Sequence, residues 1–105
     1  MKKKTQYIGQ LIKKYVREID PNANVILYGS RARGNERHDS DWDILILTDY
    51  PANLEVERKF RNELYDLELE TGESFSVFVY SKFDWQTKQK ITPYYQSVTA
   101  EGINL

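Results

Sequence analysis

Two stretches of sequence, VILYGS at residues 25–30 and SDWDILIL at residues 40–47, decide how this chain of 105 residues folds. The first opens with a short, continuously apolar and largely β-branched run that stops at Gly29, which predicts a strand covered on both faces. The second contains an apolar run of strand length that a turn signal closes at residues 48–51. The centre of the chain is therefore predicted to consist of two strands joined by a polar loop that contains glycine.

Helical patterns flank these two strands. Between Ile8 and Ile19, apolar residues recur at spacings of three and four, which predicts a helix with one buried stripe that ends at residues 20–21. A second long helix is predicted to begin after Asn53, which suits an N-cap, and to stop at Gly72. Each helix thus has an apolar stripe with which it can pack.

The region after the second helix contains a third strand. Residues 75–80 are aromatic and β-branched, whereas the aromatic tail from Phe83 is left undecided, with another short helix as one possibility. The order is helix, strand, strand, helix, strand, without repeat or linker. It predicts a single α+β domain over residues 1–105, with helices packed on a small mixed β-sheet.

The composition narrows the class of protein. The chain has 15 Lys and Arg against 16 Asp and Glu, so it lacks the basic character of a general nucleic-acid binder, and a nucleic-acid partner is not expected. It has no cysteine and one histidine, which excludes disulfides and a cysteine/histidine metal site and fits the cytoplasm. No stretch is apolar enough to span a membrane, and polar residues interrupt the segment after the N-terminal lysines.

Two aspartates at the start of the second strand carry the first chemical signal. Side chains at i and i+2 of a strand point the same way, so Asp41 and Asp43 present two carboxylates on one face, with Trp42 opposite. Magnesium prefers hard oxygen ligands and retains water, so it suits one or two carboxylates completed by substrate phosphates. The pair therefore predicts a magnesium site.

The end of the first strand carries the second signal. Gly29 allows the backbone to turn sharply and to approach a ligand closely, and Ser30 offers a hydroxyl and an amide. If residues 30–33 open a short helical turn, its unpaired amides form an anion site. Arg31 could add charge to a bound polyphosphate. The expected ligand is the phosphate chain of a nucleoside triphosphate.

The two signals together resemble a known family. Gly29-Ser30, ten intervening residues and Asp41-Trp42-Asp43 are similar to the hallmark of the DNA-polymerase-β-like nucleotidyltransferases. The fuller string from Gly29 to Ile44 most resembles the minimal nucleotidyltransferases of prokaryotes, and Glu101-Gly102-Ile103 is similar to their C-terminal ends. The resemblance covers the predicted elements over residues 25–80 and implies a palm-like fold.

The resemblance also implies an activity and a departure from it. It implies that Asp41 and Asp43 are catalytic, binding Mg2+ that bridges the phosphates of ATP, and that AMP is transferred to a hydroxyl group. A third carboxylate on a later strand completes the family site, yet residues 74–80 offer serines there. Either Glu73 substitutes for it, or the domain binds nucleotide and metal with weakened or absent transfer.

The acceptor is inferred from the size of the chain and from the resemblance. One small domain has little room for an acceptor-binding region, so a macromolecular acceptor is expected. Minimal nucleotidyltransferases are commonly the antitoxins of modules whose toxin is a HEPN-domain protein, which implies such a protein partner. The alternative is a binding module that neutralises a HEPN-type ribonuclease by contact alone. A stand-alone relative of aminoglycoside nucleotidyltransferases is a third reading, although no second domain is present to hold a drug.

Overall fold

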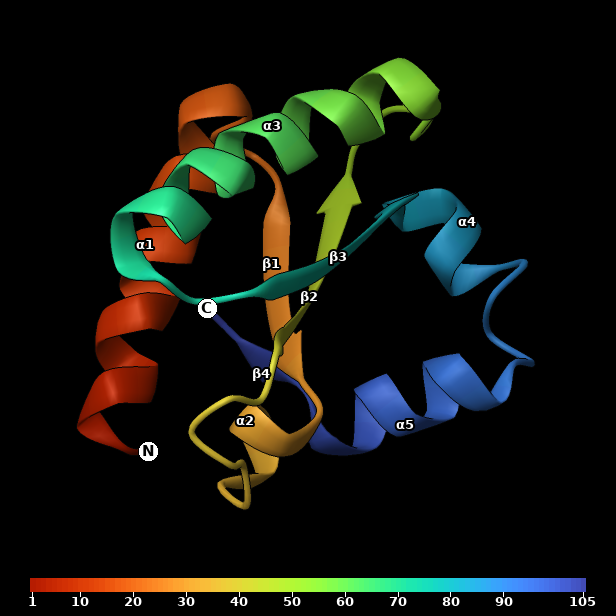
Figure 1. The fold of residues 1–105 in the computed structure, drawn as a ribbon. Coiled ribbons are helices and arrows are strands. Elements are labelled where there is room, and N and C mark those ends of the chain that lie inside the picture. Colours follow the sequence, from red (N-terminus) through yellow and green to blue (C-terminus); the bar gives the residue numbers. More distant parts are fainter.

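The structure is a computed structural model that describes residues 1–105. Its five helices and four strands follow one another as α1, β1, α2, β2, α3, β3, α4, α5 and β4 (Figure 1). The helices are α1 (Lys3–Ile19), α2 (Ser30–Arg33), α3 (Leu54–Thr71), α4 (Lys82–Gln86) and α5 (Pro93–Glu101), and the strands are β1 (Asn24–Tyr28), β2 (Trp42–Thr48), β3 (Phe75–Ser81) and β4 (Ile103–Asn104).

The four strands form one mixed sheet in the order β3-β2-β1-β4. β1 runs antiparallel to both β2 and β4, while β2 and β3 are parallel and are connected by α3. Parallel neighbours require such a crossover, whereas antiparallel ones can be joined by a loop. The predicted α+β class and mixed sheet are confirmed.

The two faces of the sheet are covered differently. α1 and α3 lie together on one face, where their apolar stripes meet alternate strand residues in a core of 14 buried residues that includes Leu27, Ile44 and Phe60. On the other face, α4 and α5 cover a smaller cluster around Leu45 and Trp85. The prediction that the first strand is covered on both faces is therefore only half right, because Ile26 and Tyr28 on this second face are only partly buried.

The predicted ends of the long second helix are confirmed. The side chain of Asn53 accepts a hydrogen bond from the amide of Val56 at 2.9 Å, which caps the start of α3. Gly72 ends the helix in the left-handed region, at φ 74°. α1 begins earlier than its apolar pattern indicated, at Lys3. None of the helices combines the length and the apolarity that a membrane span requires.

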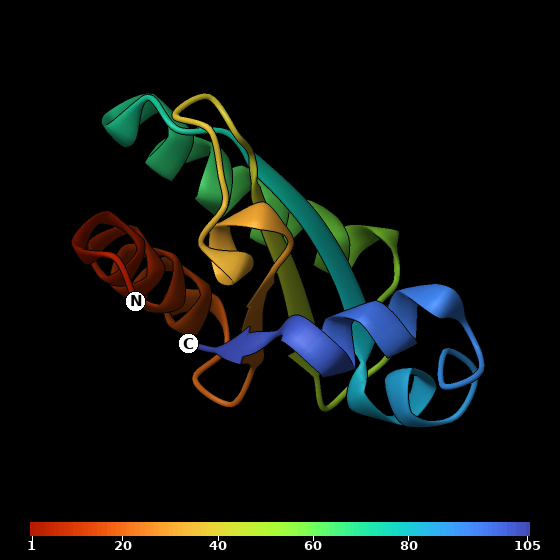
Figure 2. The ribbon, with the colours of Figure 1, turned by 90° about the horizontal axis from the view of Figure 1, so that it is seen from below.

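The tail that the sequence left undecided forms two helices and an edge strand. Ser81 caps α4 and Thr92, followed by Pro93, caps α5. α5 then returns the chain to the sheet, where β4 pairs with β1 (Figure 2). Gly102 makes this return possible: a Cβ there would lie 2.8 Å from Cγ2 of Ile26. This return places the last turn of α5 beside the end of β1.

Candidate active site

Gly29 is the point at which the two predicted signals meet. It ends β1 at φ 76° and ψ −159°, a conformation essentially restricted to glycine. A Cβ on Gly29 would lie 2.1 Å from Oδ2 of Asp43. The antiparallel pairing of Tyr28 with Asp43 causes this approach. The structure therefore places the carboxylate of Asp43 directly against the backbone of the Gly-Ser turn, which we define as Gly29 and Ser30.

The short helical turn expected after Gly29 is present as α2. The amides of Ala32 and Arg33 both donate to the carbonyl of Gly29, at 3.1 and 3.0 Å. The amides of Ser30 and Arg31 precede them and have no partner within the helix, as is general for the first amides of a helix. Together with the Ser30 hydroxyl they offer three donors at the end of β1, close to Asp43.

Arg31 has a position that its charge alone did not indicate. It is buried, with 4% of its surface exposed, and its Nη2 donates to the carbonyls of Ser40 at 2.9 Å and His38 at 3.2 Å. Its guanidinium carbon lies 4.4 Å from the ring centroid of Trp42, within the range of a cation–π contact. The side chain thus holds the loop that leads to Asp41 in place. Because the guanidinium is committed to these carbonyls, the predicted contact of Arg31 with phosphate would have to come from its main-chain amide.

Asp43 lies on the side of β2 opposite Trp42, as the strand pattern predicted, whereas Asp41 precedes the strand. Trp42 is fully buried against α1 and α3, Asp43 is partly buried on the other face, and Asp41 is exposed just before β2. Burial raises the pKa of Asp43, the negative charge of Asp41 raises it further, and Arg33 opposes both effects. The two carboxylates are therefore close enough to repel each other, and a cation between them would relieve that repulsion.

The donor set suits magnesium completed by a substrate. Two carboxylates supply hard oxygen ligands, and no group of three or more His, Cys, Asp or Glu side chains is placed to hold a metal ion. A magnesium ion at Asp41 and Asp43 would therefore need further oxygens from phosphate and water, which is how this ion is commonly bound. The residues fit the ion only as part of a complex with nucleotide.

The position of a third carboxylate is taken by serine. β3 pairs with β2 in parallel register, and Ser76 lies directly beside Asp43. Glu73, which was considered as a substitute, instead forms an ion pair with Lys4 of α1, the helix that covers the opposite face. The structure therefore does not bring Glu73 to the two aspartates.

Glu101 is a site residue to which the sequence analysis assigned no role. Its Oε1 accepts hydrogen bonds from the amide of Gly29 at 3.2 Å and from Nη1 of Arg33 at 3.0 Å. Oε2 also lies 3.0 Å from the same Arg33 nitrogen, so the contact is an ion pair. The resemblance of Glu101-Gly102-Ile103 to family C-termini was the one signal that marked this residue.

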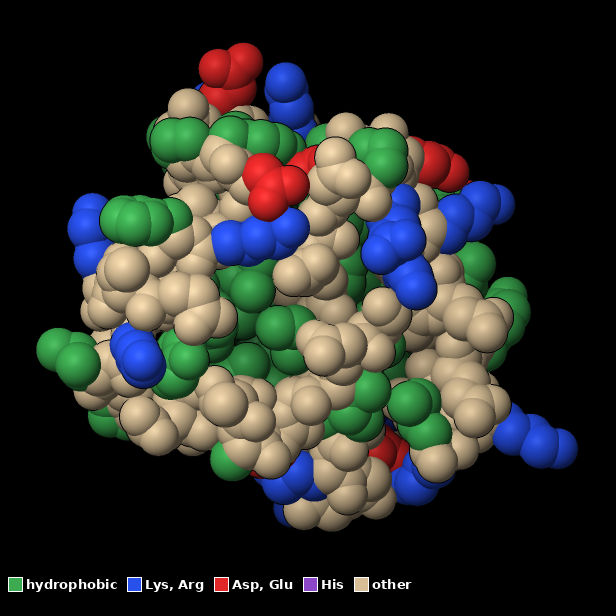
Figure 3. All heavy atoms as spheres, turned by 180° about the vertical axis from the view of Figure 1, so that it is seen from behind, with side chains coloured by type: hydrophobic (Ala, Val, Ile, Leu, Met, Phe, Trp, Pro, Cys, Tyr) green, Lys and Arg blue, Asp and Glu red, His purple; other side chains and the backbone are tan.

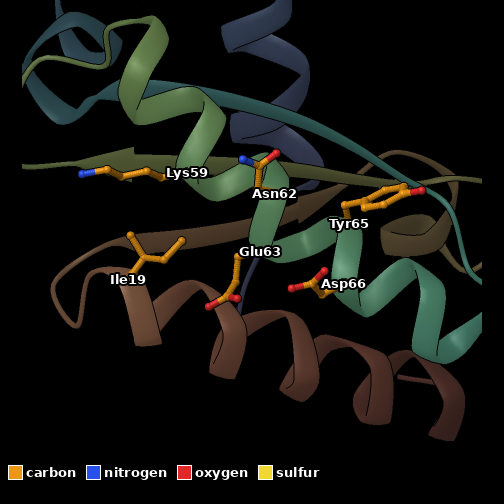
Figure 4. Close-up of a pocket in the computed structure, with 6 residues that line it drawn as sticks. All are labelled: Ile19, Lys59, Asn62, Glu63, Tyr65 and Asp66. Atoms are coloured by element: carbon orange, nitrogen blue, oxygen red, sulfur yellow. The ribbon is translucent and has the colours of Figure 1, made fainter.

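Two hollows of the surface lie away from the Gly-Ser turn. One of about 530 Å³ lies between α1 and the outer side of α3, and its side chains are mostly polar (Figure 4). Another, of about 210 Å³, is lined by residues of β1, α4 and α5, including Ile26, Trp85 and Val98. The view from behind shows apolar side chains gathered in the middle of that face, with Lys and Arg around them (Figure 3). Neither hollow is lined by the Gly-Ser turn or by the two aspartates.

Comparison with known proteins agrees with the geometry. The profile of the family described as nucleotidyltransferase domain matches residues 10–98, so the chain belongs to that family. No curated protein sequence matches the chain significantly. The suspected resemblance is thereby confirmed at the level of the family.

Two solved structures share the fold. A crystal structure of a toxin–antitoxin with AMP-PNP contains a chain that is 18% identical, with a TM-score of 0.65, covering 89% of this chain and 68% of that one. A mutant of the toxin–antitoxin MntA-HpeT, with two Asp-to-Glu changes, matches at 17% identity and a TM-score of 0.65, covering 90% of this chain and 69% of that one. At these identities the similarity establishes the fold.

Proposed function

We propose that this chain is a magnesium-dependent nucleotidyltransferase that transfers AMP from ATP to a hydroxyl group of a macromolecular acceptor. The observation that carries the proposal is the contact between Oδ2 of Asp43 and the backbone of Gly29. It joins a phosphate-binding turn to a metal-binding carboxylate, and both are needed for nucleotidyl transfer. Family membership supports the same reaction class.

Each residue of the site has a role in this proposal. The Ser30 hydroxyl and the amides of Ser30 and Arg31 hold the β- and γ-phosphates. Asp41 and Asp43 hold magnesium, which supplies charge neutralisation to the phosphates when it is bound. The acceptor oxygen forms a bond to the α-phosphorus, the bond from that phosphorus to the β-phosphate's bridging oxygen breaks, and pyrophosphate leaves together with the hydroxyl proton. The side chain of Arg31 does not touch the nucleotide in this proposal, and it positions Asp41 through its hydrogen bond to the carbonyl of Ser40.

The proposed acceptor is a protein partner of the HEPN class. The fold neighbours come from toxin–antitoxin structures, one of which was determined with AMP-PNP, an analogue of ATP. Within such a pair, this chain would be the antitoxin and its partner the toxin. Asp41 is exposed, so an acceptor hydroxyl brought by another molecule could reach this end of the site.

A second function is favoured by one observation. Ser76 stands beside Asp43 where the family pattern places a carboxylate, and Glu73 is occupied by Lys4. A domain with this deficit could retain nucleotide binding and neutralise a HEPN-type ribonuclease by contact, without transferring AMP.

One experiment separates the two functions. The chain is incubated with magnesium, ATP labelled at the α-phosphate and a HEPN-domain protein encoded beside it. We expect label on the partner, and loss of that label in Asp41→Asn and Asp43→Asn. A tight complex that carries no label would refute the enzyme and support the binding module. Asn22→Asp, which changes one charge at the far end of β1, serves as the control.

A further inference from the structure

Glu101 contacts the Gly-Ser turn across 72 residues of sequence. The carboxylate accepts the main-chain N–H of Gly29 and pairs with Arg33, which lies in the helix that the turn begins. One side chain thus binds both ends of the segment from Gly29 to Arg33. Its own side chain is 26% exposed, so the contact is partly shielded from water.

The last residues of the chain place this carboxylate. α5 ends at Glu101, and Gly102 alone connects it to β4, where Ile103 pairs with Leu27 of β1. A Cβ at Gly102 would lie 2.5 Å from the carbonyl of Val98, so glycine permits the helix to stop directly against the strand. The similarity of residues 101–103 to family C-termini thereby acquires a physical meaning, since the segment aims Glu101 at the turn.

The turn needs an external support. Gly29 holds a backbone conformation that glycine alone adopts readily, and Oδ2 of Asp43 lies so close that it leaves no room for a Cβ. Because glycine has many conformations open to it, contacts from outside the turn are needed to select this one. The Glu101 contact fixes the amide of Gly29 and leaves the amides of Ser30 and Arg31 as the free donors.

Glu101 does not have the arrangement of a third metal ligand. Its oxygens are already bound to the guanidinium of Arg33 and to the Gly29 amide, and no group of three acidic residues is positioned around a common point. Arg33 lowers the pKa of Asp43, whereas the negative charge of Glu101 raises it. A role in positioning accounts for all these contacts.

We infer that Glu101 is a positioning residue that holds the Gly-Ser turn in the conformation that receives the phosphates. The claim that this conformation receives phosphates rests on the proposed function. The claim that Glu101 stabilises the conformation of the turn does not, because it rests on the contacts of Glu101 alone. The inference makes the C-terminal end of this chain part of its nucleotide site.

Hydrogen exchange of the Gly29 amide, measured by NMR without nucleotide, tests whether Glu101 stabilises the turn. We expect exchange to rise roughly tenfold or more in Glu101→Ala, as for loss of a charge-assisted hydrogen bond, and to stay close to the parent in Glu101→Gln, whose carbonyl can still accept. Exchange of the core amide of Leu45 is expected to be unchanged. An unchanged Gly29 amide in Glu101→Ala would overturn the inference, as would an equal rise throughout the sheet.

Binding of AMP-PNP with magnesium tests the consequence. We expect the Kd to rise roughly tenfold in Glu101→Ala and only a few-fold in Glu101→Gln. Glu55→Gln removes the same charge at the start of α3 and is the matched control. Parent-like affinity in Glu101→Ala would contradict the inference while leaving the proposed function intact. A parent chain that binds no nucleotide would refute the proposed function, and the Gly29 amide would still decide whether Glu101 holds the turn.

Discussion

The two faces of the sheet have different tasks. On the face covered by α1 and α3, large apolar side chains such as Phe60 and Leu64 are completely enclosed. On the other face, Phe78 is 43% exposed and Asp43 and Tyr28 are partly buried. The face under α1 and α3, which we call the closed face, holds the larger core of 14 buried residues, whereas the other face, the open face, holds a cluster of four. The larger core allows the open face to carry two carboxylates that repel each other.

Replacing one phenylalanine on each face with alanine tests the difference between the two faces, and it is expected to have the largest effect on stability. Phe60→Ala removes a fully buried ring from the closed core and is expected to lower the free energy of unfolding by about 3–5 kcal/mol. Phe78→Ala removes a ring that is 43% exposed and is expected to cost less than about 1.5 kcal/mol. Urea unfolding followed by circular dichroism measures both. If both variants lost the same free energy of unfolding, the open face would contribute as much to stability as the closed face.

This division explains which parts of the fold could be predicted from the sequence. The apolar stripes of α1 and α3 and the strand runs reflect burial on the closed face, and burial has a clear period. The caps Asn53 and Gly72 gave the ends of α3 because their chemistry is local. α5 and β4 were left undecided because their signals, Thr92-Pro93 and Gly102, are short, and the second acquires meaning only through contact with β1.

Gly29→Ala tests the open face of the comparison. The new methyl group would collide with Oδ2 of Asp43 while the backbone stays at φ 76°, so we expect a loss of about 1–3 kcal/mol in stability and at least roughly a hundredfold loss in affinity for AMP-PNP with magnesium. Thermal unfolding and calorimetry measure the two quantities.

Gly34→Ala is its matched control. Gly34 has nearly the same φ, 78°, but a Cβ there meets nothing within 4 Å. Only the backbone cost of about 1–2 kcal/mol is expected, without a large loss of affinity. If both variants bound nucleotide equally, the contact between Gly29 and Asp43 would have no part in the site.

The site was predictable in its linear parts and not in its assembly. The spacing of Gly29-Ser30 and Asp41-Trp42-Asp43 indicated which residues belong together, because strand pairing fixes their relation. The sequence could not show that the side chain of Arg31 is committed to Ser40 and His38, since carbonyl partners leave no sequence pattern. Glu101 is 72 residues from Gly29 and reaches it only through tertiary structure.

Ser76→Asp sharpens the comparison by adding charge to the open face. The register of β2 and β3 places this residue beside Asp43, so a third carboxylate would strengthen the magnesium site and raise apparent magnesium affinity about tenfold. Without metal, the same charge is expected to lower the melting temperature, because like charges lie side by side. The measurement is the melting temperature with and without magnesium. Asn22→Asp should show no magnesium-dependent rise, and a Ser76→Asp that behaves like it would argue against a metal at Asp43.

Glu63→Gln, on the outer side of α3, is expected to have the smallest effect on stability. Partial burial raises the pKa of Glu63, and the charges of Glu18 and Asp66 raise it further, in the hollow between α1 and α3 (Figure 4). Because the folded state holds the proton of Glu63 more tightly than the unfolded chain does, the ionised carboxylate destabilises the fold at neutral pH. Stability recovers as the pH falls through the raised pKa.

Glu63→Gln should therefore melt at a slightly higher temperature than the parent at neutral pH. The difference should vanish near pH 4 and shrink in high salt, because exposed charges are screened. A variant that melts lower at neutral pH would show that Glu63 stabilises the packing of α1 on α3, and the closed layer would then depend on charge as well as on apolar burial.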